Sequence, residues 1–403
     1  MSNDSSSGGN LGFTLGIVTV AALGGFLFGF DTAVINGAVP VLNEMFMNPD
    51  SGFAAGLEIS ETSRNLWVGQ SVALALIGAA IGAFAAGPIT NHIGRKKAMV
   101  IAAVMFLASA IGSGMPFTIF DFTFWRLLGG MAFGAASVIA PAYIAEVSPA
   151  KYRGRLASMQ QLAIVIGIFV ALMSNLLIAQ NAGGASQPWL GGFAAWKWMF
   201  WIEALPALLY GVLAMQIPES PRYLVTQDRD SDALRVLTKV LGAGVAEGKV
   251  KEIHGTLSSE HKPRLSDIIG PGLFKKIVWL GIGLSVFQQF VGINVVFYYS
   301  NLLWQAVGLT EEDAFINTAI GGGTNVLTTF IAIALVDKIG RKPLLLFGSL
   351  LMMLSLGLMA FVFQTSLDAA GVLDLTGDNA GKGKIALVAL NLFIVGFGAS
   401  WGP

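Results

Sequence analysis

The sequence predicts an all-α integral membrane protein, and three observations lead to this fold class. Of its 403 residues, 54% are hydrophobic and only 12% are charged, whereas soluble domains carry about 25% charged residues. Apolar stretches of about 20 residues recur along the whole chain, and each is long enough to cross a hydrocarbon core of about 30 Å as a helix. These stretches are continuously apolar, which favours helices over the alternating strands of a membrane barrel.

Ten membrane-spanning helices are predicted from these stretches. Residues 1–12 precede the first of them and are rich in Ser and Gly, so we expect a disordered lead there. This lead has no positively charged start, and the apolar run after it is too long for a signal peptide. The predicted spans lie at about 13–40, 64–90, 97–115, 121–146, 155–179, 197–217, 273–305, 313–336, 342–364 and 384–403.

The positions of Lys and Arg predict which side of the membrane each connection faces, because cytoplasmic connections carry an excess of these residues. With the N-terminus inside, 19 of the 24 Lys and Arg fall in cytoplasmic connections and four fall outside. We therefore expect a multi-pass protein of the inner (plasma) membrane with a cytoplasmic N-terminus. The connections 41–63 and 365–383 are expected outside.

Composition also excludes several classes of protein. The net charge is zero and the chain has no basic block, so nucleic acid is not an expected partner. The sequence has no Cys, and its three His stand in polar stretches without the spacing of metal ligands. It contains no nucleophile–base pattern and no phosphate-binding loop. We therefore expect neither an enzyme nor a protein with a bound metal or cofactor.

A long polar stretch divides the chain into two membrane parts. Six spans precede it in 13–217, the stretch itself covers 218–272, and four spans follow in 273–403. We expect 218–272 to be a cytoplasmic helical linker that lies against the membrane domain. An apolar stripe at helical spacing supports this interpretation, formed by Ala233, Leu234, Leu237, Val240 and Leu241.

One short sequence occurs twice on the same predicted side of the membrane. NHIGRKK at 91–97 follows the second span, and DKIGRKP at 337–343 follows the eighth span, 246 residues later. Repeated halves with equivalent second and eighth spans imply a fold of two six-helix bundles. Because the sequence stops within the tenth span, the second bundle is expected to be incomplete, as in a fragment that lacks the rest of span 10 and spans 11 and 12.

Several motifs occur in an order that resembles one known family. GPITNHIGRK at 87–96 is similar to the signature of the major facilitator superfamily, although His92 stands where Arg is usual. The resemblance covers nearly all of the chain after residue 12, and it implies the major-facilitator fold and sugar transport by alternating access. A Gly-Pro-x-x-Trp motif of the family is cut at 402–403. Five further motifs resemble the sugar porters: RLLGG at 126–130, YIAEVSP at 143–149, YRGR at 152–155, PESPRYL at 218–224 and QQFVGIN at 288–294.

Neutral amide side chains in the seventh span suit a sugar. One Gln or Asn supplies both a donor and an acceptor to hydroxyl groups without burying a charge. Gln288, Gln289 and Asn294 lie there, with aromatic side chains such as Tyr298 beside them. On a straight helix Asn294 stands about 140° around from Gln289, so the two face one ligand only if the helix bends or unwinds near Gly292. Hydrogen bonding to neighbouring helices is the alternative role of these amides.

The family resemblance adds residues from other spans to the expected sugar site. It places Gln161 of span 5 and Asn325 of span 8 at the sugar, with Phe28 of span 1 packing nearby. It also places Trp401 of span 10 near the site. These assignments are implied by the resemblance alone.

Two ionisable residues of consequence lie inside predicted spans. A charged side chain at mid-span costs roughly 2.5–3.5 kcal/mol, so it usually marks a pathway or a paired structural contact. Asp31 of span 1 and Arg126 of span 4 both fall in the outer half of the membrane, where pairing is feasible. The resemblance implies a role in proton coupling, because proton symporters of the family carry Asp at this position and facilitative relatives commonly carry Asn. A permanent salt bridge is the alternative.

Charged residues at the cytoplasmic ends of the spans resemble the inner gating network of the family. Ion pairs of this kind hold the outward-open state and break when the inside opens. Alternatively, some are solvated loop charges that follow the positive-inside rule. The residues are Arg95, Glu146, Arg153, Glu219 and Arg222 in the first half and Asp337 and Arg341 in the second.

These observations favour a secondary active transporter that imports a monosaccharide, either a hexose or a pentose, together with a co-transported proton. A facilitative sugar or polyol uniporter is one alternative, in which Asp31 is structural. A membrane sugar sensor that does not transport is another, although such sensors tend to carry long cytoplasmic tails. The expected partners are the sugar and the lipid bilayer, and we expect a monomer. The amides suit glucose, galactose, xylose and inositol alike.

Overall fold

The structure, a computed structural model, describes residues 9–150, 152–259, 269, 274–306, 308–367 and 380–402. Within these ranges every regular element is an α-helix or a short 3-10 helix. Ten helical segments there are long and apolar enough to cross a membrane. The predicted all-α membrane fold is therefore confirmed. Residues 1–8 of the expected lead lie outside the described ranges, and α1 already begins at Leu11.

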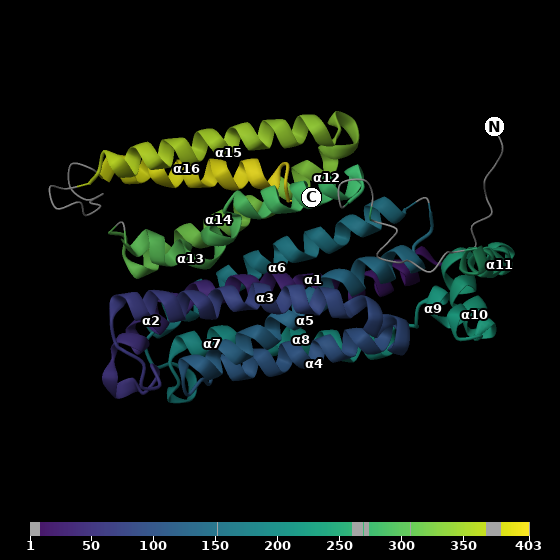
Figure 1. Ribbon diagram of the computed structural model, residues 1–403, viewed down its shortest axis with the longest axis horizontal. Coiled ribbons are helices and arrows are strands. Elements are labelled where there is room, and N and C mark those ends of the chain that lie inside the picture. The colour runs from purple at the N-terminus through teal and green to yellow at the C-terminus, as the bar shows by residue number, and fades with distance from the viewer. Residues whose placement is uncertain are drawn as a thin grey trace.

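Two helical bundles lie side by side, and three linker helices stand at one end of them (Figure 1). The second bundle comprises α12 (Lys276–Phe290), α13 (Ile293–Ala306), α14 (Glu311–Ile339), α15 (Arg341–Gln364) and α16 (Ala380–Gly398). The linker contains α9 (Pro221–Thr226), α10 (Asp230–Leu241) and α11 (Ala243–Ser259). The first bundle comprises α1 (Leu11–Val34), η1 (Ile35–Gly37), α2 (Val39–Met47), η2 (Pro49–Ser51), α3 (Glu61–Ile93), α4 (Arg95–Ser113), α5 (Ile119–Val147), α6 (Arg153–Ala182), η3 (Leu190–Gly192), α7 (Ala195–Trp201) and α8 (Ala204–Gln216).

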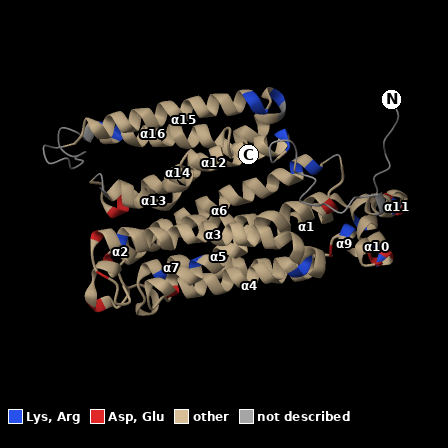
Figure 2. Cartoon of the chain, in the orientation of Figure 1, with Lys and Arg blue, Asp and Glu red and all other residues tan. Residues whose placement is uncertain are grey.

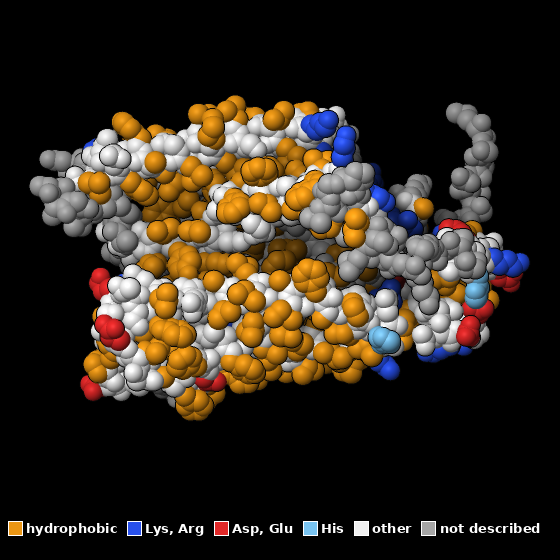
Figure 3. Space-filling model, in the orientation of Figure 1, with side chains coloured by type: hydrophobic (Ala, Val, Ile, Leu, Met, Phe, Trp, Pro, Cys, Tyr) orange, Lys and Arg blue, Asp and Glu red, His pale blue; other side chains and the backbone are white. Residues whose placement is uncertain are grey.

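The bundles have two distinct ends. We call the end that carries α9, α10 and α11 the linker end, and the end that carries α2 the far end (Figure 1). Between these ends, many apolar side chains lie on the face of both bundles that Figure 3 shows. Phe84, Leu205 and Leu346 are 85%, 72% and 74% exposed. Exposed apolar surface on this scale fits contact with lipid tails rather than with water.

The first predicted span differs from the helix in the structure. The expected helix over 13–40 ends at Val34 and passes through the 3-10 turn η1 into the separate helix α2. The connection expected over 41–63 therefore contains regular structure, namely most of α2 and the turn η2.

The sixth and seventh predicted spans are each divided. In the sixth, α7 and α8 meet at Ile202 and Glu203. Pro206 accounts for this interruption, because it lacks the N–H that would bond the Ile202 carbonyl in a continuous helix. In the seventh, α12 ends before Gly292, which has a φ of 86° that no continuous α-helix allows. Apolar runs thus predicted where the chain crosses the membrane but not where the helices break.

Glycines let neighbouring helices approach closely in the first bundle. A Cβ atom on Gly29 of α1 would overlap the carbonyl oxygen of Ile164 in α6. Gly78 and Gly82 of α3 meet the backbone of α5 in the same way. Small residues four apart are common between membrane helices, because they bring the two backbones into van der Waals contact.

The repeated sequence forms the same turn in both bundles. Gly94 separates α3 from α4 and Gly340 separates α14 from α15, each with a φ of 87°. This left-handed backbone favours glycine. A Cβ atom on Gly94 would overlap the Glu219 carboxylate, whereas no described atom lies within 4 Å of a Cβ atom on Gly340. Among the described residues, the turn therefore holds a carboxylate in the first bundle alone.

The linker helix α10 packs against the first bundle. The Asn10 N–H at the start of α1 donates a hydrogen bond to the Lys239 carbonyl of α10 at 2.9 Å. The expected apolar stripe is shifted around this helix, because Leu234 and Leu241 are only half-buried. The predicted linker residues 260–268 and 270–272 lie outside the described ranges. The buried positions follow the spacing i, i+3, i+4, i+7, at Ala233, Val236, Leu237 and Val240.

Candidate transport pathway

A cavity of about 1090 Å³ lies between the two bundles. Its first-bundle wall includes Arg155 at the start of α6, and Lys338 and Arg341 stand opposite at the adjoining ends of α14 and α15. These three cations are all at the linker end, so the cavity opens there. Gln288 and Trp401 also line it, and Gln288 lies about 18 Å along α12 from the start of that helix. The cavity thus leads from the linker end to the middle of the molecule.

The three predicted amides of the seventh span form one hydrogen-bonded chain. Asn294 Nδ2 donates to Gln289 Oε1 at 2.8 Å, and Gln289 Nε2 donates to Gln288 Oε1 at 3.3 Å. The break at Gly292 makes this possible, because it turns Asn294 of α13 back toward the end of α12. The bend that a shared site requires is therefore present in the structure.

Trp401, which follows α16, meets the amide chain at Gln288. Its carbonyl accepts a hydrogen bond from Gln288 Nε2 at 3.4 Å, and its indole Nε1–H donates to Ser349 Oγ of α15 at 3.0 Å. The structure thus brings four predicted sugar-site residues together: Gln288, Gln289, Asn294 and Trp401.

The other four predicted sugar-site residues make no described hydrogen bond with the amide chain. Gln161 is half-buried on α6. Asn325 is buried on α14 and faces Gly398 of α16. The last two are aromatic: Phe28 stacks on Phe133 of α5 with ring centroids 4.8 Å apart, and Tyr298 is buried on α13.

Asp31 and Arg126 form a buried ion pair between α1 and α5. Arg126 Nη1 lies 2.8 Å from Asp31 Oδ1, and both side chains are almost fully buried. The guanidinium also donates through Nη2 to the Asp31 carbonyl at 3.2 Å. Asp31 Oδ2 and Arg126 Nε have no hydrogen-bond partner among the described residues. The pair is therefore buried and only partly satisfied by the described residues, and burying such a pair costs free energy.

Glu203 is a third ionisable residue at this site, and the sequence analysis missed it. Its side chain is fully buried between α7 and α8, and neither carboxylate oxygen has a hydrogen-bond partner in the described part of the chain. It interacts electrostatically with both Asp31 and Arg126. A signal was present in the sequence, since an acidic residue inside the predicted span 197–217 is a functional candidate by its position alone.

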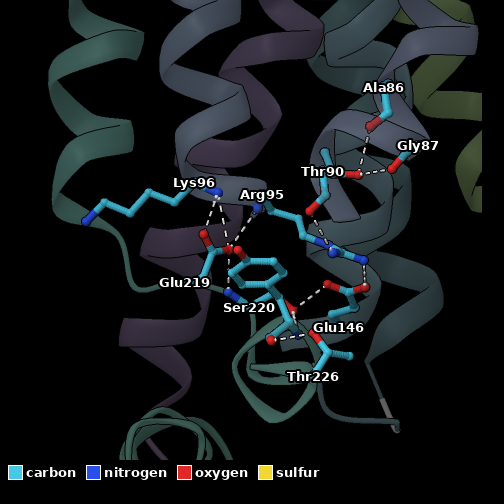
Figure 4. Close-up of polar contacts among 10 residues, drawn as sticks. Ala86, Gly87, Thr90, Arg95, Lys96, Glu146, Glu219, Ser220 and Thr226 are labelled. Carbon is cyan, nitrogen blue, oxygen red and sulfur yellow. Dashed lines mark hydrogen bonds and ion pairs between the residues drawn. The ribbon is translucent and has the colours of Figure 1, made fainter. Parts of the chain in front are cut away.

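Figure 4 shows the polar network at the linker end of the first bundle. Glu219 accepts hydrogen bonds from the N–H groups of Arg95 at 2.9 Å and Lys96 at 3.2 Å, at the start of α4, where the helix dipole favours an anion. The Arg95 guanidinium forms an ion pair with Glu146 of α5 at 2.9 Å. Glu146 also accepts a hydrogen bond from the Ser220 hydroxyl. These contacts join α4 and α5 to the linker.

Three predicted gating residues, Arg95, Glu146 and Glu219, thus belong to one network. Two others stand exposed at helix starts: Arg153 on α6 and Arg341 on α15. Arg222 is half-buried in α9. The side chain of Asp337 lies outside the described residues.

At the far end the two bundles are in contact. Asn36 Nδ2 in η1 donates to the Phe297 carbonyl and to Ser300 Oγ of α13, both at 2.9 Å. Glu311 at the start of α14 accepts a hydrogen bond from the Ala185 N–H at 2.9 Å. These bonds cross between the bundles, so the path is closed at the far end while it is open at the linker end.

A polar path between two bundles, open at one end and closed at the other, defines a membrane transporter for small polar molecules. Comparison with known proteins agrees with this class. The Sugar (and other) transporter family matches residues 17–403, and the chain belongs to that family.

Individual relatives support the assignment. A glucose transport protein from Synechocystis sp. is 56% identical over 404 residues, which cover 100% of this chain and 82% of that protein. The D-xylose-proton symporter of Escherichia coli is 37% identical over 414 residues, covering 98% of this chain and 78% of the symporter. A structure of the E. coli xylose transporter XylE in a partially occluded inward-open conformation matches with a TM-score of 0.81 and 34% identity, covering 97% of this chain and 85% of that one. The predicted sugar-porter resemblance and major-facilitator fold are confirmed.

Proposed function

We propose that the protein is a secondary active transporter that imports a monosaccharide, a hexose or a pentose, by proton symport. It acts as a monomer with a cytoplasmic N-terminus, needs no cofactor, and alternates access between the two sides of the inner membrane. The observation that carries this proposal is the combination of a buried cluster of ionisable groups with a chain of neutral amides that reaches the large cavity at Gln288.

The amide chain suits a sugar as the transported molecule. Gln288, Gln289 and Asn294 are hydrogen-bonded to one another, and an arriving hydroxyl takes over these bonds as both donor and acceptor. Trp401 adds an aromatic surface for the apolar face of a sugar ring. Two relatives, a glucose transport protein and a D-xylose-proton symporter, are consistent with this class of substrate.

The buried cluster suits a proton as the coupled ion. Asp31, Glu203 and Arg126 together carry a charge of −1 when both acids are ionised and no net charge when one of them binds a proton. A neutral cluster rearranges in a dry bundle at much lower cost than a charged one. Tyr298 connects this cluster to the sugar site, because it lies on the same helix as Asn294 and interacts electrostatically with Arg126 and Asp31.

The distribution of basic residues supports the proposed orientation. Most Lys and Arg gather at the linker end and on the linker helices (Figure 2), as they do in cytoplasmic connections. The linker end is then cytoplasmic and the far end is outside. In this orientation the structure is open to the cytoplasm, the state from which an importer releases sugar.

Asp31→Asn tests the coupling in proteoliposomes. The variant imitates the protonated acid, so we expect it to bind sugar and to exchange labelled for unlabelled sugar. It should not accumulate sugar when a pH gradient is imposed, whereas the wild type should. Asp50→Asn, a change at an exposed residue of the far end, is the matched control and should accumulate sugar normally.

The same measurements separate the alternatives. Uphill accumulation by Asp31→Asn would mean that the proton binds elsewhere. A wild type that equilibrates sugar without responding to a pH gradient would be a facilitator, with Asp31 as a structural partner of Arg126. A wild type that binds sugar but neither exchanges nor accumulates it would be a sensor.

A further inference from the structure

A second cavity, of about 320 Å³, lies away from the sugar path at the linker end of the first bundle. We call it the α8–α10 pocket, because it lies between the end of α8, with the connection that follows, and one face of α10. The starts of α1 and α4 complete it with Phe13 and Lys96. Glu219 of the gating network lines one part of this cavity, and no sugar-site residue lines it.

The pocket carries an excess of positive charge. Two carboxylates line it, and both are already engaged: Glu219 by the backbone N–H groups of Arg95 and Lys96, and Asp232 by the guanidinium groups of Arg229 and Arg235. The lining also contains two lysines, Lys96 and Lys239. Neither ammonium group has a carboxylate partner in the described part of the chain.

These two lysines approach the pocket from different elements. Lys96 belongs to the first turn of α4, and Lys239 belongs to the last turn of α10, where its Nζ lies 5.6 Å from the centroid of the Phe13 ring. An anion bound between them would join the linker to the membrane bundle. A phosphate group has several acceptor oxygens and can accept hydrogen bonds from both ammonium groups.

The surface next to the pocket is apolar and faces lipid. Leu205, Leu208, Val212 and Met215 of α8 are 40–72% exposed and form one stripe along the helix. The stripe ends at Gln216, which lines the pocket. An acyl chain lying along this stripe therefore brings the headgroup of its lipid to the pocket, whereas a free anion makes no use of the stripe.

We propose that the α8–α10 pocket binds the phosphate of an anionic phospholipid, held by Lys96 and Lys239, with an acyl chain along the exposed face of α8. Phe13 and Val236 of the pocket wall contact the glycerol and the first methylene groups. The bound lipid fixes α10 against α1 and α4, so its headgroup acts as a bridge between the linker and the membrane domain.

Native mass spectrometry of the detergent-purified protein measures this binding, with dioleoyl phosphatidylglycerol as the probe and dioleoyl phosphatidylcholine as the neutral comparison. We expect the wild type to bind phosphatidylglycerol about tenfold more tightly than phosphatidylcholine, or more tightly still. The double variant Lys96→Gln/Lys239→Gln should lose about 10–100-fold in affinity, because it loses two charge-assisted contacts. The control Lys275→Gln/Lys276→Gln removes the same charge from exposed residues at the start of α12 and should stay within about twofold.

A third variant keeps the proposal testable if the double variant is unstable. Gln216→Trp fills the pocket without changing its charge and should weaken phosphatidylglycerol binding to a similar extent. Equal retention of the two lipids by the wild type would overturn the proposal, because the pocket would not select an anionic headgroup. Equal losses of affinity in the pocket and control variants would overturn it in favour of diffuse electrostatic attraction. Complete displacement of the lipid by excess glycerol 3-phosphate or inorganic phosphate would overturn it in favour of a site for a soluble anion.

Discussion

Gln289 occupies the centre of the amide chain, where it donates to Gln288 and accepts from Asn294. Gln289 is exposed in this open structure, and in Gln289→Ala a sugar hydroxyl loses its partner in the site once the bundles close around it. We expect a cost of about 1–3 kcal/mol, which is a loss of roughly 5–150-fold in sugar affinity. Isothermal titration calorimetry with the purified protein measures this change.

Gln227→Ala is the control for that measurement, because Gln227 is exposed at the end of α9 and bonds only a neighbouring backbone carbonyl. Its sugar affinity should match the wild type. Wild-type affinity in a folded Gln289→Ala protein would place the sugar away from the amide chain.

At the scale of single residues, the sequence identified side chains by their chemistry and their position in a span. Asp31 and Arg126 were predictable as a pair because each is an isolated charge in an apolar run. Glu203 carries the same signal and was overlooked. The direction of each amide bond was not predictable, since it depends on how Gly292 turns α13. The neighbour of Gln161 shows a similar limit: Gln160 is the one buried against α1, beside Gly25.

At the scale of helices, Gly29 sets the separation of α1 and α6. Gly29→Ala places a methyl group against the Ile164 carbonyl, so the helices must move apart. We expect the free energy of unfolding to fall by about 1–3 kcal/mol. Thermal unfolding of the purified protein, followed by tryptophan fluorescence, reports this as a lower Tm.

Gly16→Ala on the same helix is the matched control, because no described atom lies within 4 Å of its Cβ position. Alanine also suits a helix better than glycine, by roughly 0.5–1 kcal/mol. Its Tm should be equal to or above that of the wild type. Equal Tm values for the Gly29 and Gly16 variants would show that α1 and α6 are not held at this distance.

Helix lengths and order followed from the apolar runs, but three breaks did not. Pro206 in the sixth span is a local signal that a closer reading of the sequence contains. The breaks at η1 and Gly292 have weaker signals, because Asn36 precedes Gly37, a pair common in turns, and Gly292 stands between Gln289 and Asn294. The sequence predicts a bend at Gly292 only if these amides share one ligand. Backbone conformation at these points depends on contacts between the bundles, which a pattern along one chain does not encode.

At the scale of the whole molecule, the absence of Cys from the sequence makes the orientation testable by single substitutions. Gln227→Cys at the linker end and Glu58→Cys at the far end are both exposed. A membrane-impermeant maleimide should label Glu58→Cys in intact cells and should label Gln227→Cys only after permeabilisation. The reverse pattern would invert the proposed topology.

Asn36 tests the closure of the far end, because its side chain bonds α13 of the opposite bundle twice. Asn36→Ala should favour the state that is closed at the linker end. Ser285 lines the large cavity, so a maleimide should alkylate a cysteine there readily in a membrane preparation. The double variant Ser285→Cys/Asn36→Ala should be alkylated more slowly than Ser285→Cys alone. Asn48→Ala is the control, since Asn48 caps η2 within its own bundle; it should leave the rate unchanged. An unchanged rate with Asn36→Ala would mean that other contacts hold the far end shut.

The bonds of Asn36 and Glu311 across the far end also affect the apparent affinity for sugar that arrives from that side. A ligand arriving there binds only the fraction of molecules whose far end is open, and its apparent Kd is the intrinsic Kd divided by that fraction. The three bonds, at about 0.5–1.5 kcal/mol each, bias the empty protein by about 1.5–4.5 kcal/mol, or roughly 10–2000-fold. Substitutions at residues that never touch the sugar are therefore expected to change its apparent Kd from that side.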